Sequence, residues 1–138
     1  MNYRAAVLED VEELMPIMMD GAAKVGEPSY QVRFDPQDVR SVLENTIVNG
    51  VVIRGDASVA GAVLFPFLWN TDFLDGHILF WHFMSNKEIM ILDHMVALLR
   101  GLGCHRVHAT SHFPENTILK RYQGLGFSPR EVISTVNL

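Results

Sequence analysis

Apolar residues recur along the chain with two different spacings, and segments of the two kinds follow one another. Val11, Leu14, Met15 and Met18 are spaced i, i+3, i+4 and i+7, which predicts a helix. The same kind of spacing recurs at residues 36–49, 89–102 and 115–123. Short apolar segments that are typical of strands occupy residues 3–6, 51–53, 59–65, 78–84, 106–110 and 131–136.

Turn and cap residues set the boundaries between these segments. Asp35 followed by Pro36 is typical of a helix start, because Asp accepts hydrogen bonds from free backbone N–H groups and Pro suits the first helical position. Gly50 ends the same helix. The short connection at residues 55–58 predicts an antiparallel pair for the two strands beside it. The longer segments 21–34 and 66–76 are predicted as loops.

The order of the elements indicates the fold class. It is strand, two helices, three strands, helix, strand, helix and strand, which one sheet with helices around it accommodates. Residues 78–84 are apolar on both faces except for His82, which favours a central place for that strand. We expect an α/β protein with a central mixed, mostly antiparallel sheet flanked by about four helices. The length of 138 residues predicts a single domain, residues 1–138.

Composition and charge exclude several classes of protein. Hydrophobic residues make up 49% of the chain and the mean hydropathy is +0.15, which is too apolar for a disordered chain. The net charge of −5 argues against nucleic acid and anionic membranes as partners. The lone Cys104 excludes an intrachain disulfide, and no apolar stretch reaches the about 20 residues of a membrane span. We expect a cytoplasmic protein that folds alone or as a homodimer.

A motif near the end of the chain resembles a known family. Residues 116–127 have the sequence Asn-Thr-Ile-Leu-Lys-Arg-Tyr-Gln-Gly-Leu-Gly-Phe, and residues 3–10 have the sequence Tyr-Arg-Ala-Ala-Val-Leu-Glu-Asp. Together with the order of elements, these segments resemble the late motif and the first strand of the GNAT superfamily of acyl-CoA-dependent N-acyltransferases. The resemblance covers essentially the whole chain. It implies the GNAT fold, acetyl-CoA as co-substrate and an amine of a small molecule or peptide as acceptor.

The resemblance also implies roles for three residues. Tyr122 matches the tyrosine that protonates the leaving thiolate, although its ring also suits packing against the sheet. The asparagine of the family lies seven residues before that tyrosine, where this chain has Glu115, and Asn116 is displaced by one position. Asn116 is therefore either a cofactor contact or a helix cap. His82 matches the position of a base that takes the proton of the amine, since an imidazole suits this task, or it is a core histidine.

The segment that should bind the pyrophosphate of CoA departs from the family pattern. The family carries an Arg or Gln and glycines there, and this chain has Phe83-Met84-Ser85-Asn86-Lys87-Glu88. We expect Phe83, Met84, Asn86 and Lys87 to be the cofactor contacts. Ser85-x-x-Glu88 has the pattern of a capping box, which leaves fewer N–H donors for a ligand. Glu88 is predicted to place a negative charge where the pyrophosphate would lie.

The six histidines fall between residues 77 and 112, which raises the hypothesis of a metal site. His105 and His108 are three apart on a predicted strand and so point to opposite faces. His82 and His108 could meet if the fourth and fifth strands are neighbours, but no carboxylate stands at ligand spacing. We therefore expect no metal. The acceptor pocket is expected beside residues 67–75 and beside Glu27 and Tyr30.

These observations lead to one predicted function and one alternative. The prediction is an N-acetyltransferase that moves an acetyl group from acetyl-CoA to a primary amine by direct attack. The alternative is a catalytically inactive protein of the same fold that serves as a binding or structural module, which the glycine-free segment after the fourth strand favours. A metal-dependent hydrolase or lyase built on the histidines is a third hypothesis.

Overall fold

The computed structural model describes residues 2–110, 116–128, 136 and 138, without the side chains of residues 116–119. Its strands are β1 (Arg4–Ala5), β2 (Val51–Arg54), β3 (Ser58–Phe67), β4 (Asn70–Phe83) and β5 (Arg106–Ala109). Its α-helices are α1 (Val11–Gly21), α2 (Glu27–Tyr30), α3 (Pro36–Asn49), α4 (Ile91–Gly101) and α5 (Asn116–Gly124). The 3-10 segments η1 (Leu8–Asp10) and η3 (Asn86–Glu88) precede α1 and α4, and the π-helical segment η2 (Ala22–Gly26) joins α1 to α2. The strand predicted at residues 131–136 lies, apart from position 136, outside the described residues.

The strands form one sheet in the order β1-β2-β3-β4-β5. The pairs β1–β2, β2–β3 and β3–β4 are antiparallel, and β4–β5 is parallel. This is the mixed, mostly antiparallel sheet that the order of elements predicts, and β4 lies between two partners as its apolar sequence indicates. A register shift leaves Leu79 as an extra residue in β4, between Ile78 opposite Ala62 and Phe80 opposite Gly61.

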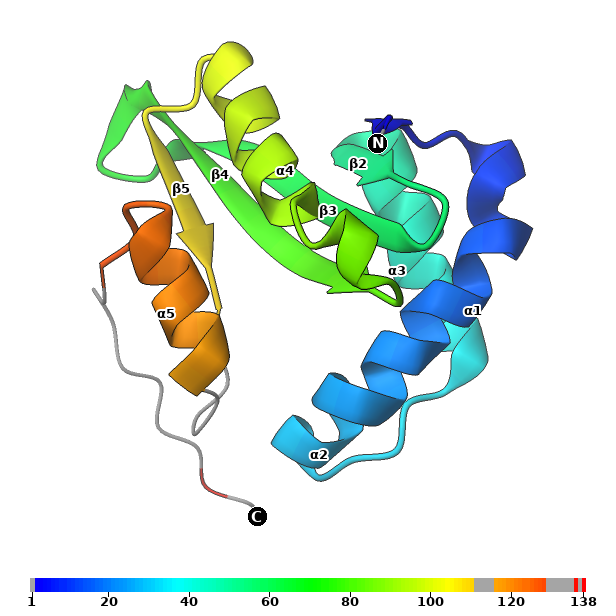
Figure 1. Ribbon diagram of the computed structural model, residues 1–138. Coiled ribbons are helices and arrows are strands. Elements are labelled where there is room, and N and C mark those ends of the chain that lie inside the picture. Colours follow the sequence, from blue (N-terminus) through cyan, green and yellow to red (C-terminus); the bar gives the residue numbers. More distant parts are fainter. Residues whose placement is uncertain (1, 111–115, 129–135, 137) are drawn as a thin grey trace.

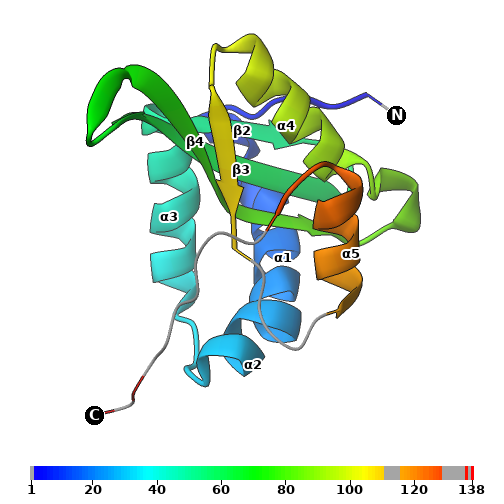
Figure 2. The same cartoon turned by 90° about the vertical axis from the view of Figure 1, so that its left-hand side faces the viewer.

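Helices cover both faces of the sheet (Figure 1). One face packs against α1 and α3 through a cluster of buried apolar residues that includes Leu14, Leu43 and Val59. The other face packs against α4 and α5 through a second cluster that includes Ala60, Leu92 and Tyr122. Successive residues of β3 thus serve different faces, because side chains alternate along a strand. Figure 2 shows β5 and α5 from the side of the sheet's β5 edge.

The caps of α3 form as predicted. The Asp35 carboxylate accepts hydrogen bonds from the backbone N–H groups of Gln37 (2.8 Å) and Asp38 (3.3 Å). At the other end, the N–H of Gly50 donates to the carbonyl of Thr46, 2.9 Å away. A Cβ at Gly50 would lie 2.3 Å from the carbonyl oxygen of Ala62, so this close approach of α3 to β3 requires glycine.

Two predicted loops are wrong, because regular structure continues through them. The segment 21–34 is helical as far as Tyr30, and it ends at Gln31, which adopts a left-handed conformation with φ of 56°. Glu27 holds the return of the chain by accepting a hydrogen bond from the N–H of Phe34 at 3.0 Å. Glu27 and Phe34 are seven residues apart, so local helix and turn propensities do not reveal this hydrogen bond.

The segment 66–76 is a β-hairpin, since β3 runs to Phe67 and β4 begins at Asn70. Its strands are stabilised from the neighbouring β5, where the guanidinium of Arg106 lies 4.7 Å from the ring centre of Phe67 and 4.9 Å from that of Phe73. The sequence has polar, loop-forming residues in this segment, and it does not reveal that Arg106 of β5 lies beside them. In the described part of the chain, no helix is both long and apolar enough to span a membrane.

Candidate functional site

The first feature of the candidate site is an unpaired edge of β4. Pairing with β5 covers only Asp75 to Ile78 of β4, opposite Arg106 to Ala109. Toward its carboxyl end β4 continues to Phe83, and the two strands separate (Figure 1). Among the described residues, the β5 side of β4 therefore has no strand partner after Ile78. A backbone edge of this kind offers N–H and C=O groups to an extended ligand.

The backbone groups of Phe83 and Met84 face opposite sides of this edge. The N–H of Met84 donates to the carbonyl of Ala57 at 2.8 Å, on the β3 side. Because backbone groups alternate along a strand, the N–H of Phe83 faces the open side. Of the two predicted cofactor contacts, Phe83 keeps a backbone donor for a ligand, and Met84 offers only its exposed side chain.

Tyr122 lies where β4 and β5 separate. Its hydroxyl accepts a hydrogen bond from the indole N–H of Trp81 on β4 at 2.9 Å and donates to the carbonyl of Thr110, just after β5, at 2.9 Å. The residue is 5% exposed, and this burial raises the pKa of the phenol. Tyr122 therefore carries its proton at neutral pH. It is a core residue whose hydroxyl lies between β4 and the end of β5.

His82 lies on the opposite side of β4. It follows Trp81 directly, so the two side chains project to different faces of the sheet. Its Nε2 atom is 2.7 Å from Oδ2 of Asp20, near the end of α1, and its ring packs against Gly21, where a Cβ would lie 3.0 Å from Cγ of the ring. No sequence pattern marks Asp20, which lies 62 residues away in the chain.

Asp20 is an ionised partner for the imidazole. Its pKa is lowered first by the hydrogen bond with His82 and then by that with Lys24, whose Nζ is 3.1 Å from Oδ1. A neutral imidazole that donates from Nε2 to Asp20 has its lone pair on Nδ1, where it accepts a proton. The pair Asp20–His82 is therefore an oriented base, on the side of β4 opposite Tyr122.

The predicted contacts Asn86 and Lys87 are exposed residues of η3. Ser85 caps this segment as predicted, since its hydroxyl accepts from the N–H of Lys87 at 3.3 Å. Asn116 is the first residue of α5, and its side chain lies outside the described part of the chain. Neither its role as a cofactor contact nor its role as a cap is therefore tested.

The prediction for Glu88 is wrong. Its carboxylate does not face the ligand side of the helix start, because it is directed into the protein and is 2% exposed. It accepts from the N–H of Ala57 at 2.8 Å and from the hydroxyl of Ser58 at 2.6 Å, and it touches Gly55. The N–H and O–H donors of the turn between β2 and β3 compensate its burial, and no capping box forms at Ser85. The local pattern could not show this turn, which lies about 30 residues earlier.

Substitution of Glu88 by glutamine should lower stability and leave acetyl-CoA binding unchanged. The amide keeps one acceptor for the turn and loses the charge-assisted bond to Ser58, at a cost of about 1–2 kcal/mol. Urea unfolding and calorimetry with acetyl-CoA measure the two quantities. A clear gain in acetyl-CoA affinity in E88Q would show instead that the Glu88 charge repels the ligand.

Arg121 is a further residue that the sequence analysis missed. From α5 it donates to the carbonyl of Ile89 at 3.0 Å and to the carboxylate of Asp93, at the start of α4. Met90, the N-cap residue of α4, provides no side-chain cap. Arg121 and the Asp93 carboxylate that it binds thus lie at the start of α4, whose first two residues, Ile91 and Leu92, are fully buried. The only available signal was the position of Arg121 directly before Tyr122.

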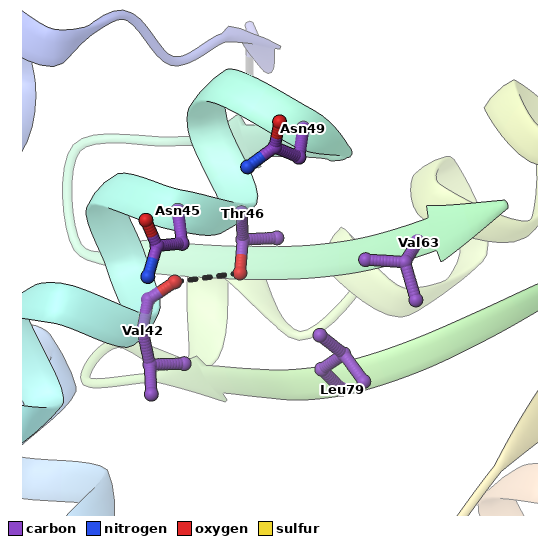
Figure 3. Close-up of a pocket in the computed structure, with 6 residues that line it drawn as sticks. All are labelled: Val42, Asn45, Thr46, Asn49, Val63 and Leu79. Carbon is purple, nitrogen blue, oxygen red and sulfur yellow. Dashed lines mark hydrogen bonds between the residues drawn. The ribbon is translucent and has the colours of Figure 1, made fainter.

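A hollow of about 280 Å³ lies between α3 and the strands β3 and β4 (Figure 3). In Figure 3 the side chains of Val63 and Leu79 project toward one another beside α3. Val63 shares its face of β3 with Val59, which packs beneath α1 and α3, so the hollow lies on the same face of the sheet as His82. Its remaining lining comes from α3: Val42, Asn45, Thr46 and Asn49.

Comparison with known proteins supports the fold. No protein-family model matches the chain, and no curated protein matches its sequence. A predicted acetyltransferase from Clostridium acetobutylicum, solved with acetyl-CoA, has a TM-score of 0.71 at 17% identity over 99% of this chain and 95% of that chain. The ribosomal-protein-alanine N-acetyltransferase of Brucella melitensis has a TM-score of 0.73 at 12% identity, over 99% and 98%.

Another solved structure with this fold carries a different description. It is a transcriptional regulator from Bacillus halodurans, with a TM-score of 0.75 at 16% identity over 99% of both chains. The chain has the fold of the GNAT acetyltransferases, as the sequence predicts.

Proposed function

We propose that this protein, which has the GNAT acetyltransferase fold, transfers an acetyl group from acetyl-CoA to a primary amine. The observation that carries the proposal is the open edge of β4 with an acidic group on one side and an oriented base on the other. Tyr122 lies toward α5, and the pair Asp20–His82 lies toward α1. Sequence identity to the solved acetyltransferases is low, so the arrangement of these residues bears most of the argument.

The residues of this chain suit the binding of acetyl-CoA. The N–H groups that face outward on β4 donate hydrogen bonds to the amide carbonyls of an extended pantetheine arm. The Arg121 guanidinium, at the start of α4, attracts the pyrophosphate. To bind it, Arg121 releases Asp93, which remains at the edge of the site.

The proposed reaction is a direct transfer. The amine nitrogen attacks the thioester carbonyl carbon, a C–N bond forms and the C–S bond breaks. His82 takes the proton that the amine loses, on Nδ1, and Asp20 stabilises the imidazolium that results. The leaving thiolate receives a proton from Tyr122, which then no longer donates to Thr110.

Titration of the purified chain with acetyl-CoA tests the first step. We expect saturable binding by calorimetry and a rise of the melting temperature, because a ligand that binds only the folded state stabilises it. Substitution of Arg121 by glutamine should weaken binding at least tenfold, since one charge-assisted contact is lost. Substitution of the exposed Arg100 on α4 is the matched control and should have no effect. Absence of any shift at millimolar acetyl-CoA would refute the proposal.

The hydrogen bonds of Tyr122 favour a second candidate function, a binding module without catalysis. In the structure the hydroxyl proton is donated to Thr110 and a lone pair is occupied by Trp81, so the phenol is engaged on both sides. The fold also occurs in a protein described as a transcriptional regulator. Mass spectrometry of a panel of primary amines incubated with acetyl-CoA separates the two functions. Acetylated product supports the enzyme, and binding without turnover supports the module.

A further inference from the structure

The parallel pairing of β4 and β5 brings three potential metal ligands together, away from Tyr122 and His82. His77 on β4 is the register partner of His108 on β5, and Asp75 precedes His77 by two residues. Because side chains alternate along a strand, Asp75 and His77 project to the same face. Their ligand atoms and that of His108 all lie within 4.8 Å of one another.

The surroundings of His108 are unusual for a histidine that serves only packing. Its Nε2 atom is shielded from solvent and has no hydrogen-bond partner. The nearest carboxylate oxygen is Oδ1 of Asp75, at 3.5 Å. Asp75 itself is 3% exposed. A shielded imidazole nitrogen whose contact with a carboxylate is this long is costly, and in the tautomer that leaves a lone pair on Nε2 it is a ligand for a divalent metal.

We propose that Asp75, His77 and His108 bind one divalent transition-metal ion of the zinc class. Two imidazoles and one carboxylate are borderline ligands of the kind that Zn²⁺ and Co²⁺ accept, and three protein ligands leave a further position open. Tetrahedral zinc holds its ligand atoms about 3.4 Å apart. Binding therefore requires the ligand atoms, now within 4.8 Å of one another, to approach further through rotation of the His77 and His108 rings.

The partners of these residues are compatible with a metal. Asp75 already accepts from Arg106, with Nε 2.9 Å from Oδ1 and Nη2 3.0 Å from Oδ2. A carboxylate has about four lone-pair sites, so two remain. Arg106 therefore fixes the orientation of the carboxylate, which is the usual task of groups that contact metal ligands. The ring of Phe65 stacks on that of His77 at 4.5 Å and limits the access of water.

Metal titration of the untagged, chelator-treated protein tests the proposal directly. Addition of Co²⁺ should give the visible absorption bands of tetrahedral cobalt, saturating at one equivalent, and Zn²⁺ should displace it. H77A and H108A should each weaken binding at least tenfold. H94A removes an exposed histidine of α4 as the matched control and should bind as the unaltered protein does.

A second measurement keeps the test decisive if a variant fails to fold. In the unaltered protein, Zn²⁺ should shift the imidazole NMR signals of His77 and His108 and leave that of His94 in place. Equal perturbation of all histidine signals, or the lack of saturable binding, would refute the site. Because these readouts do not involve acetyl transfer, they are independent of the proposed function.

Discussion

Substitution of His82 by alanine should lower the rate of acetyl transfer about 100- to 10,000-fold, the usual contribution of a positioned base. The effect should appear in kcat, because His82 contacts neither the pyrophosphate region near Arg121 nor the outward N–H groups of β4. Affinity for acetyl-CoA should stay within about twofold, since β4 keeps its backbone edge. Steady-state kinetics with an accepted amine, together with calorimetry, measure both quantities.

A second variant separates a base from a residue that only packs. Substitution of Asp20 by asparagine removes the carboxylate that orients the ring of His82 through Nε2, so kcat should fall while affinity for acetyl-CoA stays within about twofold. H94A is the control. An unchanged kcat in H82A would remove His82 from the mechanism.

The sequence predicts most of the fold because its signals are local. The α3 cap at Asp35, the antiparallel pair around residues 55–58 and the apolar β4 all follow from spacing and from residue type. The two wrong loops lie where distant residues contribute the stability. Arg106 from β5 lies over the hairpin at Phe67, and Glu27 binds the backbone of Phe34 across a return of the chain.

The candidate site was predicted in part, for the same reason. Tyr122 and His82 were found through a motif and a strand position, and the structure places them on opposite sides of β4. Trp81, the partner of Tyr122, is 41 residues away, and Asp20, the partner of His82, is 62 residues away. No local sequence pattern joins either pair. Glu88 illustrates an error of the opposite kind. The sequence Ser85-x-x-Glu88 fits a capping box, but the Glu88 carboxylate instead accepts a hydrogen bond from Ser58 in a distant turn.

The parallel register of β4 and β5 explains why the sequence does not reveal the proposed metal ligands. Spacing along the chain compares His105 with His108 and offers no carboxylate at ligand spacing. Asp75 lies 33 positions before His108 and becomes its neighbour only when Asp75 pairs with Arg106. Sequence spacing identifies ligands within one helix or hairpin, and it does not identify ligands that two paired strands supply.

Substitution of Asp10 by asparagine should lower the free energy of unfolding at pH 7 by about 2 kcal/mol, because it breaks a buried ion pair and leaves the buried Arg54 with Glu13, 2.8 Å from Nη2, as its acidic partner. Asp10 is 6% exposed and Arg54 is 3% exposed. The Asp10 carboxylate accepts from Arg4 at 2.7 and 2.9 Å, from the N–H of Val7 at 2.9 Å and from Arg54 at 3.3 Å. These bonds join β1 and β2 to the start of α1.

The sign of the pH dependence follows from the pKa of Asp10. The hydrogen bonds from Arg4 and then from Val7 hold this pKa well below its usual range. Asp10 therefore stabilises the fold above the pKa of the unfolded chain, about 3.9, and loses that contribution as pH falls toward the folded value. Urea unfolding from pH 7 to pH 3 should show the difference between D10N and the unaltered protein shrinking below about pH 4.

Substitution of Glu12 by glutamine is the matched control, because it removes an exposed carboxylate from the first turn of α1, where Glu12 pairs with Arg40. A surface pair contributes little to stability, so E12Q should unfold close to the unaltered protein at pH 7. If D10N and E12Q lost the same small amount, the Asp10–Arg54 pair would be no more stabilising than a surface contact. If D10N kept its full deficit at pH 3, the loss would arise from packing of the amide and not from the charge of Asp10.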